Sequence, residues 1–242
     1  LDDLGLSQNI YEDLKDVLKF TQGLILISGP TGSGKTTTLY SILKELNSDD
    51  KKIITVEDPI EYKIDSINQV PINNKVGLSF ELVLKNILRQ DPDIIFIGEI
   101  RDKFSLDIAL QASLTGHLVL ASIHASSSVE TITRLIDLKA DPFLISTTLK
   151  AVMAQRLVLA HCKSCENGCK KCNFTKFYDR TSISEILKVD EQISSLIFNK
   201  ASFNELKEYL KNINFKTMLD NGKQKVKDGL TTLEEVYKVV NF

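Results

Sequence analysis

The sequence predicts an α/β domain that is built on a mainly parallel sheet and is followed by a helical segment. Up to about residue 125, four nearly continuous apolar runs alternate with helical patterns, as expected for strands that are buried on both faces of a parallel sheet. A glycine-rich loop joins the first of these strands to the first helix. From about residue 142 onward the strand pattern stops, and we expect helices there, interrupted by a cluster of cysteines.

The composition is that of a globular protein. The 242 residues are 43% hydrophobic, and their 11 Gly and 5 Pro exclude collagen-like and low-complexity chains. With 30 Lys and Arg against 32 Asp and Glu, the net charge is -2, so no general positive field attracts nucleic acid and we expect no such partner. No apolar run approaches the roughly 20 residues of a membrane-spanning helix, so we expect any membrane contact to be peripheral.

The expected elements follow one another along the chain. The strands are 23–28, 52–57, 93–98 and 117–124, and the helices are 36–46, 80–89, 104–114 and 128–138. A Ser or Thr followed three residues later by Glu is typical of a helix start. Three such pairs are Ser127/Glu130, Ser182/Glu185 and Thr232/Glu235. In the helical segment near the end of the chain we expect a solvated basic face that carries Lys223, Lys225 and Lys227.

The glycine-rich loop has the pattern of a phosphate-binding loop, Gly, four residues, then Gly-Lys-Thr, between a strand and a helix. Glycines let backbone N–H groups close around a polyphosphate, and the helix N-terminus adds a favourable dipole. Lys35 is expected to reach the β- and γ-phosphates, and Thr36 to place its hydroxyl on Mg²⁺. The nucleotide-binding residues that we predict are Gly29, Pro30, Thr31, Gly32, Ser33, Gly34, Lys35, Thr36 and Thr37.

Hydrolysis needs a further acid at the carboxyl end of a neighbouring strand, because open α/β sheets bind their ligands there. Glu99 follows the strand at 93–98, and Glu57 and Asp58 close the strand at 52–57. The strand register alone leaves both positions open for the catalytic acid.

Two arginines are candidates for neutralising charge on a γ-phosphate, either in their own subunit or across an interface. Arg101 follows Glu99 by two residues, and Arg89 closes the helix that precedes the strand at 93–98. The alternative for each is an ordinary surface arginine without a role in the chemistry.

All four cysteines lie within eleven residues as two Cys-x-x-Cys pairs: Cys162, Cys165, Cys169 and Cys172. Four thiolates at about 2.3 Å complete a tetrahedral Zn²⁺ site and leave no position for water, so we predict a structural zinc that fixes the loop. A thiol redox pair and an iron–sulfur cluster are the alternatives. Such clustering in a chain with an adequate core favours a reducing compartment, and we expect the cytosol.

Six ordered blocks resemble the signature blocks of secretion ATPases, which power type II secretion and type IV pilus machines. The match runs from about residue 4 to about residue 185. The blocks are Gly-Pro-Thr-Gly-Ser-Gly-Lys-Thr-Thr-Thr-Leu-Tyr (29–40), Thr-Val-Glu-Asp-Pro-Ile-Glu-Tyr (55–62), Leu-Arg-Gln-Asp-Pro-Asp (88–93), Gly-Glu-Ile-Arg-Asp (98–102), Leu-Thr-Gly-His-Leu-Val (114–119) and Ala-Gln-Arg-Leu (154–157).

The resemblance implies a RecA-like P-loop fold and roles for single residues. Glu99 would be the catalytic acid of the Walker B element, facing the Walker A loop. Glu57 would help to hold the water shell of Mg²⁺, and His124 would sense the state of the nucleotide and pass it to the subunit interface. The acidic box would consist of Glu57, Asp58 and Glu61, and the histidine box of His117 and His124.

The resemblance also implies a function and a division of the chain. The function is an ATP-hydrolysing homo-hexameric motor, cytoplasmic and peripheral to the inner membrane, that works with platform and assembly proteins to build a type II secretion pseudopilus or a type IV pilus. The tetracysteine element favours assembly or secretion over pilus retraction. The division is a RecA-like core at 1–158, a zinc-binding element at 159–180 and a helical subdomain at 181–242.

Two departures from the family pattern keep alternatives open. The histidine box commonly ends Thr-Leu-His-Thr-Asn, whereas residues 122–126 are Ser-Ile-His-Ala-Ser, which removes two side chains suited to a phosphate relay. Members also carry a preceding domain, so we interpret the chain, which begins Leu-Asp-Asp, as part of a longer polypeptide. The alternatives are a nucleotide-binding assembly or regulatory module with little turnover, a retraction-type ATPase and a nucleic-acid translocase.

Overall fold

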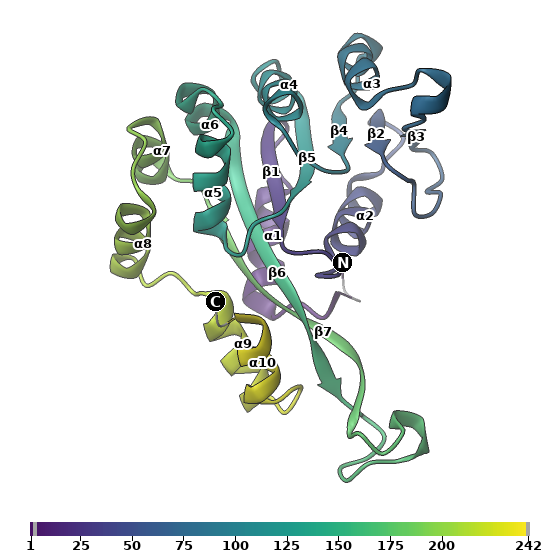
Figure 1. Cartoon of the computed structure of the whole chain (residues 1–242), viewed down its shortest axis with the longest axis vertical. Helices are drawn as coiled ribbons and strands as arrows, with labels where there is room; N and C mark the ends of the chain where they lie inside the picture. Colours follow the sequence, from purple (N-terminus) through teal and green to yellow (C-terminus); the bar gives the residue numbers. More distant parts are fainter. Residues whose placement is uncertain (2–3, 241–242) are drawn as a thin grey trace.

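The computed structural model describes residue 1 and residues 4–240, which form one sheet with helices on both faces (Figure 1). The strand order is β3-β2-β4-β5-β1-β6-β7. All neighbouring strands are parallel except β6 and β7, which are antiparallel. The predicted α/β class is confirmed. The strands are β1 (Gly23–Ser28), β2 (Ile53–Glu57), β3 (Asn68–Pro71), β4 (Ile94–Ile97), β5 (Leu118–Ile123), β6 (Leu149–His161) and β7 (Phe177–Lys188).

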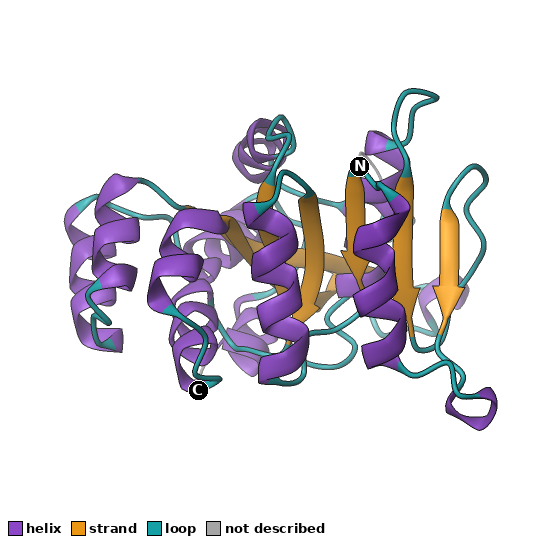
Figure 2. Cartoon of the chain, turned by 90° about the horizontal axis from the view of Figure 1, so that it is seen from above, coloured by secondary structure: helices purple, strands orange, loops and turns teal. Residues whose placement is uncertain are grey.

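Helices cover both faces of the sheet (Figure 2). Alternate residues of β1 enter the two apolar layers, Ile25 on one face and Leu24 on the other, which explains the continuous apolar runs of the sequence. One layer is completed by α1 (Gln8–Val17) and α2 (Lys35–Leu46). The other is completed by α3 (Phe80–Ile87), α4 (Lys103–Leu114), α5 (Ser128–Asp137), α6 (Pro142–Thr148), α7 (Glu191–Phe198) and α8 (Phe203–Asn212).

The elements expected before residue 140 are present with bounds within two residues of those expected. The four strands are β1, β2, β4 and β5, and the four helices are α2, α3, α4 and α5. Ser127 caps α5, because its hydroxyl accepts a hydrogen bond from the Glu130 N–H at 3.1 Å. Helix α1 and strand β3 had no predicted counterpart.

The expectation of helices alone after residue 142 is wrong. Strands β6 and β7 form a long hairpin there, and Ser182 and Glu185 lie within β7 and do not form a capping box. Residues 149–158 contain two Leu, two Ala and one Met beside two Val, so their apolar run suits a helix as well as a strand. Pairing with β1 on one side and β7 on the other decides for the strand.

The hairpin reaches well below the other strands in Figure 1, and the loop that holds the cysteines forms its lower end. Helices α9 (Met218–Lys227) and α10 (Leu233–Val240) pack against its middle, where Val236 meets Val158 and Ile183. The proposed divisions at residues 158 and 180 fall inside β6 and β7. The three-part division of the chain stays a prediction. Residues 2–3 of its first part and residues 241–242 of its last part lie outside the described residues.

One lysine of the expected basic face lies elsewhere. Lys225 on α9 is buried, whereas Lys223 and Lys227 are exposed. Across residues 4–240, no helix is long and apolar enough to cross a bilayer.

Candidate active site

One cavity of about 930 Å³ lies at the carboxyl ends of the parallel strands. Residues 31–37 of the glycine-rich loop form one wall. The ends of β2, β4 and β5 supply the facing side chains, which include Glu57, Glu99, Arg101 and His124, and the acidic-box residues Asp58 and Glu61 also line the cavity. The structure thus brings most of the predicted site residues together around a single space.

The glycines of the loop are required by its backbone. Gly29, Gly32 and Gly34 have φ values of 154°, 78° and 87°, which residues with a side chain rarely adopt. A Cβ on Gly29 would lie 2.4 Å from the Ser33 Oγ and 2.6 Å from the Gln155 carbonyl oxygen. The loop therefore packs tightly on β6 behind it.

Lys35 is the cation of the loop. Its Nζ donates to the carbonyl oxygens of Gly29 at 2.7 Å and Pro30 at 3.0 Å. Burial lowers the pKa of Lys35; the negative charge of Glu99 opposes this shift and the positive charge of Arg156 adds to it. A poorly solvated ammonium group gains when an anion approaches, so the loop is suited to a polyphosphate.

Gln155 on β6 holds the loop from behind. Its Nε2 donates to the Ser33 carbonyl oxygen at 2.7 Å, and its Oε1 accepts from the Thr38 hydroxyl at 2.8 Å. The side chain is buried. We assigned no role to Gln155 from the sequence; the available signal was a polar pair, Gln155 and Arg156, inside an apolar run.

Glu99 lies between a histidine and an arginine. Its Oε1 is 2.8 Å from the His124 Nε2, and its Oε2 is 2.5 Å from the Arg101 Nε. The hydrogen bond and charge of Glu99 raise the pKa of Arg101. The carboxylate is thereby oriented in the cavity by side chains from the loops that follow β5 and β4.

Glu57 has a different environment, because it is buried and surrounded by neutral donors. Its Oε1 accepts from the Thr55 hydroxyl at 2.6 Å and from the Gln69 Nε2 at 3.2 Å, and its Oε2 accepts from the Tyr40 hydroxyl. Burial and the bond to Glu57 raise the pKa of Tyr40. Our sequence reasoning missed all three donors, since their common partner is evident only in the fold.

Arg89 and His117 lie away from the cavity. Arg89 is exposed in the 3₁₀ turn η3 (Leu88–Gln90) before β4. His117 precedes β5 and places its Nδ1 2.9 Å from the Ala112 carbonyl oxygen at the end of α4. Both therefore sit at the amino ends of strands, whereas the cavity borders the carboxyl ends. A role for Arg89 across a subunit interface stays a prediction.

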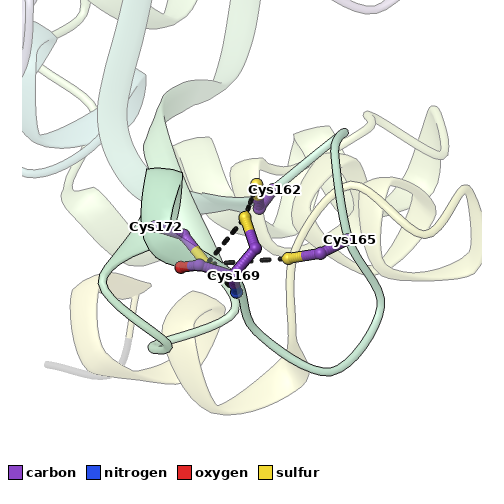
Figure 3. Close-up of side chains that lie close together, drawn as sticks. All are labelled: Cys162, Cys165, Cys169 and Cys172. Carbon is purple, nitrogen blue, oxygen red and sulfur yellow. Dashed lines mark hydrogen bonds between the residues drawn. The ribbon is translucent and has the colours of Figure 1, made fainter.

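The four cysteines form a second candidate site at the end of the hairpin (Figure 3). Their sulfur atoms all lie within 4.8 Å of one another, with separations of 3.6 Å for Cys165 and Cys172 and 4.0 Å for Cys162 and Cys169. Tetrahedral zinc with bonds of about 2.3 Å places its sulfur ligands about 3.8 Å apart. The Cys169 N–H donates to the Cys172 sulfur and lowers the pKa of that thiol to about 6. The residues therefore fit a zinc ion.

Comparison with known proteins identifies the family. The profile described as type II/IV secretion system protein matches residues 1–238. The chain belongs to this family. The chain is 41% identical over 265 residues to the type II secretion system ATPase E of Vibrio cholerae, an alignment that covers 99% of the chain and 52% of the relative. It is 40% identical over 264 residues to the type IV pilus assembly ATPase PilB of Thermus thermophilus, covering 98% of the chain and 30% of PilB.

Solved structures support the same assignment. The pilus retraction motor PilT with bound ADP matches the chain with a TM-score of 0.81 and 30% identity, over 100% of this chain and 66% of PilT. The predicted RecA-like P-loop fold is confirmed by these relatives, which include proteins named as ATPases. The chain spans about half the length of the type II secretion relatives that it matches.

Proposed function

We propose that this chain is the ATP-hydrolysing part of a homo-hexameric motor for type II secretion or type IV pilus assembly. The observation that carries the proposal is the shared cavity, in which the phosphate-binding loop and Glu99 face the same space. The similarity to ATPase E and PilB supports a role in type II secretion or type IV pilus assembly. We place the motor in the cytoplasm, peripheral to the inner membrane, where platform and assembly proteins would bind it.

The chain's own residues account for the chemistry. Backbone N–H groups of the loop and the Lys35 ammonium group would bind the phosphates, once Lys35 releases the Gly29 and Pro30 carbonyl oxygens. Thr36 would hold Mg²⁺, which supplies neutralisation of the charge on the phosphates. Glu99 would orient the attacking water and accept its proton, and its partners Arg101 and His124 would turn toward the γ-phosphate.

Substitution of Glu99 tests this function. Glu99→Gln keeps the size of the side chain but loses the base, so we expect kcat for ATP to fall about 100-fold to 10,000-fold while nucleotide still binds. Phosphate release by the intact polypeptide at saturating ATP and Mg²⁺ measures the effect. Glu191→Gln, an exposed acid at the start of α7, is the control and should match the wild type. Equal background rates in the wild type and Glu99→Gln would instead favour a nucleotide-binding module with little turnover.

The oligomeric state tests the ring. We expect the intact polypeptide to run as a hexamer on gel filtration when ATP is present, because the proposed motor is a ring and the proposed interface role of Arg89 needs a neighbouring subunit. A monomer both with and without ATP would contradict the ring and the role of Arg89.

We also propose that the four cysteines hold one structural Zn²⁺. Metal analysis should find one zinc per chain, and Cys165→Ser should lose it while Ser164→Ala, in the same loop, keeps it. Because the cluster lies at the end of the hairpin, ATP binding by the Cys165→Ser variant should stay within threefold of the wild type, a range of about 0.6 kcal/mol. The proposal would be contradicted by iron in place of zinc, or by a disulfide in protein that was purified in the presence of a reductant.

A further inference from the structure

Arg156 is a buried charge with an unusual set of partners. It lies in β6 and is only 5% exposed. Its Nη1 donates to the Gln155 carbonyl oxygen and its Nη2 to the Ser126 carbonyl oxygen, both at 3.0 Å. Burial lowers the pKa of Arg156, and Glu130 and Glu185 oppose that shift by charge alone. A buried guanidinium normally pairs with a carboxylate because removing its charge from water is costly, so two main-chain carbonyls call for an explanation.

The first carbonyl belongs to the support of the phosphate-binding loop. The Gln155 oxygen packs directly against Gly29, since a Cβ on that glycine would approach it to 2.6 Å. The side chain of the same Gln155 holds Ser33 through its carbonyl oxygen. One end of the guanidinium is therefore fixed to the back of the loop.

The second carbonyl belongs to the β5–α5 loop, which consists of residues 124–127. Ser126 comes two residues after His124, whose Nε2 contacts Glu99. The His124 side chain is 46% exposed, so its position depends on the backbone of this loop more than on packing. The loop is otherwise tied to its own helix, because the Ser126 N–H donates to the Glu130 carboxylate at 2.7 Å.

We propose that Arg156 is a positioning residue that sets the separation between the phosphate-binding loop and His124, and through His124 the orientation of Glu99. The proposal rests on the proposed ATPase function and adds a residue that touches neither nucleotide nor Glu99. Arg156 acts by bridging two carbonyls, one on each side of the site. Its charge also acts on Lys35, so a test must separate bridging from charge.

Two substitutions make that separation. Arg156→Lys keeps the charge but lacks the planar fork that reaches two carbonyls, and Arg156→Met removes both. We expect each variant to lower kcat about tenfold or more while the KM for ATP stays within threefold, because Gln155 still holds the phosphate-binding loop. Arg134→Met, an exposed arginine on α5, should behave as the wild type. A fully active Arg156→Lys would overturn the bridging role.

A double substitution tests the route through His124. If Arg156 acts by placing His124, the kcat loss in His124→Ala with Arg156→Lys should be no greater than the larger single loss. A structural defect elsewhere would add to the effect of His124→Ala. Multiplied losses in the double variant would therefore overturn the proposal while leaving the ATPase function intact.

Hydrogen exchange decides the inference even without turnover. In Arg156→Lys we expect the Ser126 amide to exchange about tenfold faster or more than in the wild type, while amides of residues 31–37 and of β4 stay within threefold. Unchanged β4 amides report that the fold is retained. Unchanged exchange at Ser126 would overturn the positioning role. If the wild type releases no phosphate, only the proposed ATPase function is contradicted. The exchange rate of the Ser126 amide would still test the positioning role of Arg156.

Discussion

The cavity and the β6–β7 hairpin hold their charged side chains in different ways. At the cavity, Glu99 is paired with Arg101 and His124, whose side chains are 64% and 46% exposed. On the hairpin, Glu185 is buried and accepts hydrogen bonds from the backbone N–H groups of Ser128 and Met218, both at 2.8 Å. One carboxylate thus has partners that are free to turn, and the other has partners fixed in the backbone.

Because of this contrast, Glu99 and its partners suit a reactive role, whereas Glu185 suits a structural role. Exposed ion pairs contribute little to stability, so Glu99, Arg101 and His124 can exchange partners when a ligand arrives. Glu185 instead joins the first residues of α5 and α9 to β7, and a buried carboxylate without its donors is costly. Substitutions of Glu99, Arg101 or His124 should therefore change nucleotide chemistry at little cost in stability, and substitution of Glu185 should do the reverse.

The largest change in nucleotide binding is expected at Lys35. Lys35→Met removes the cation of the phosphate-binding loop, so the Kd for ATP should rise about 100-fold, or about 2.7 kcal/mol. Because burial already lowers the pKa of Lys35, removing the charge should leave the thermal midpoint within about 2 °C. Calorimetric titration and thermal unfolding measure the two quantities. Lys51→Met, in the exposed loop after α2, should change neither, and unchanged ATP affinity in Lys35→Met would contradict the cavity's assignment.

The opposite outcome is expected at Glu185. Glu185→Gln places an amide nitrogen against N–H and O–H donors, and we expect the free energy of unfolding to fall by about 2–4 kcal/mol. Urea unfolding measures this loss, with Glu208→Gln, an exposed acid on α8, as the control. The Kd for ATP should stay within about threefold, a range of about 0.6 kcal/mol. A stable Glu185→Gln variant with weakened ATP binding would contradict the structural role of Glu185 and its contrast with Glu99.

The cavity could be predicted from the sequence because its information is local. The strand β1, the glycine-rich loop and α2 are consecutive, and the acids Glu57 and Glu99 stand directly at the ends of apolar strands. Parallel strands then bring those ends to one edge of the sheet. The donors around Glu57 escaped prediction, since Gln69 reaches it only through the pairing of β2 with β3.

The hairpin could not be predicted because its partners lie far apart in sequence. Ser182 and Glu185 have the spacing of a capping box, yet the Glu185 carboxylate caps α5 and α9, which begin 57 residues before it and 33 residues after it. Lys225 stands between Lys223 and Lys227, a pattern typical of a solvated face, yet its Nζ reaches the Gly5 carbonyl oxygen, 220 residues away in sequence. Local pattern carries no information about such contacts, and tertiary packing overrides it.

The smallest expected effect is a pH dependence that belongs to Lys225. Its Nζ donates to the Thr181 hydroxyl at 3.0 Å and to the carbonyl oxygens of Gly5 and Ser182, and burial lowers the pKa of Lys225 to about 8, with Asp228 opposing. Between that pKa and the ordinary value of 10.5, the unfolded chain binds the proton and the folded chain does not. Stability from this group therefore rises with pH, by at most about 1.4 kcal/mol per pH unit.

Lys225→Met lacks this titration, so the stability of the wild type relative to Lys225→Met should increase from pH 7.5 to pH 9.5, by about 1–2 kcal/mol in total. Urea unfolding at several pH values measures the difference, in which the other titrating groups cancel. The same comparison with Lys223→Met, exposed on the same helix, should be flat. If the difference for Lys225 is also independent of pH, the ammonium group is solvated in the folded chain. The contacts of α9 with the hairpin would then not be fixed in the way that Glu185 suggests.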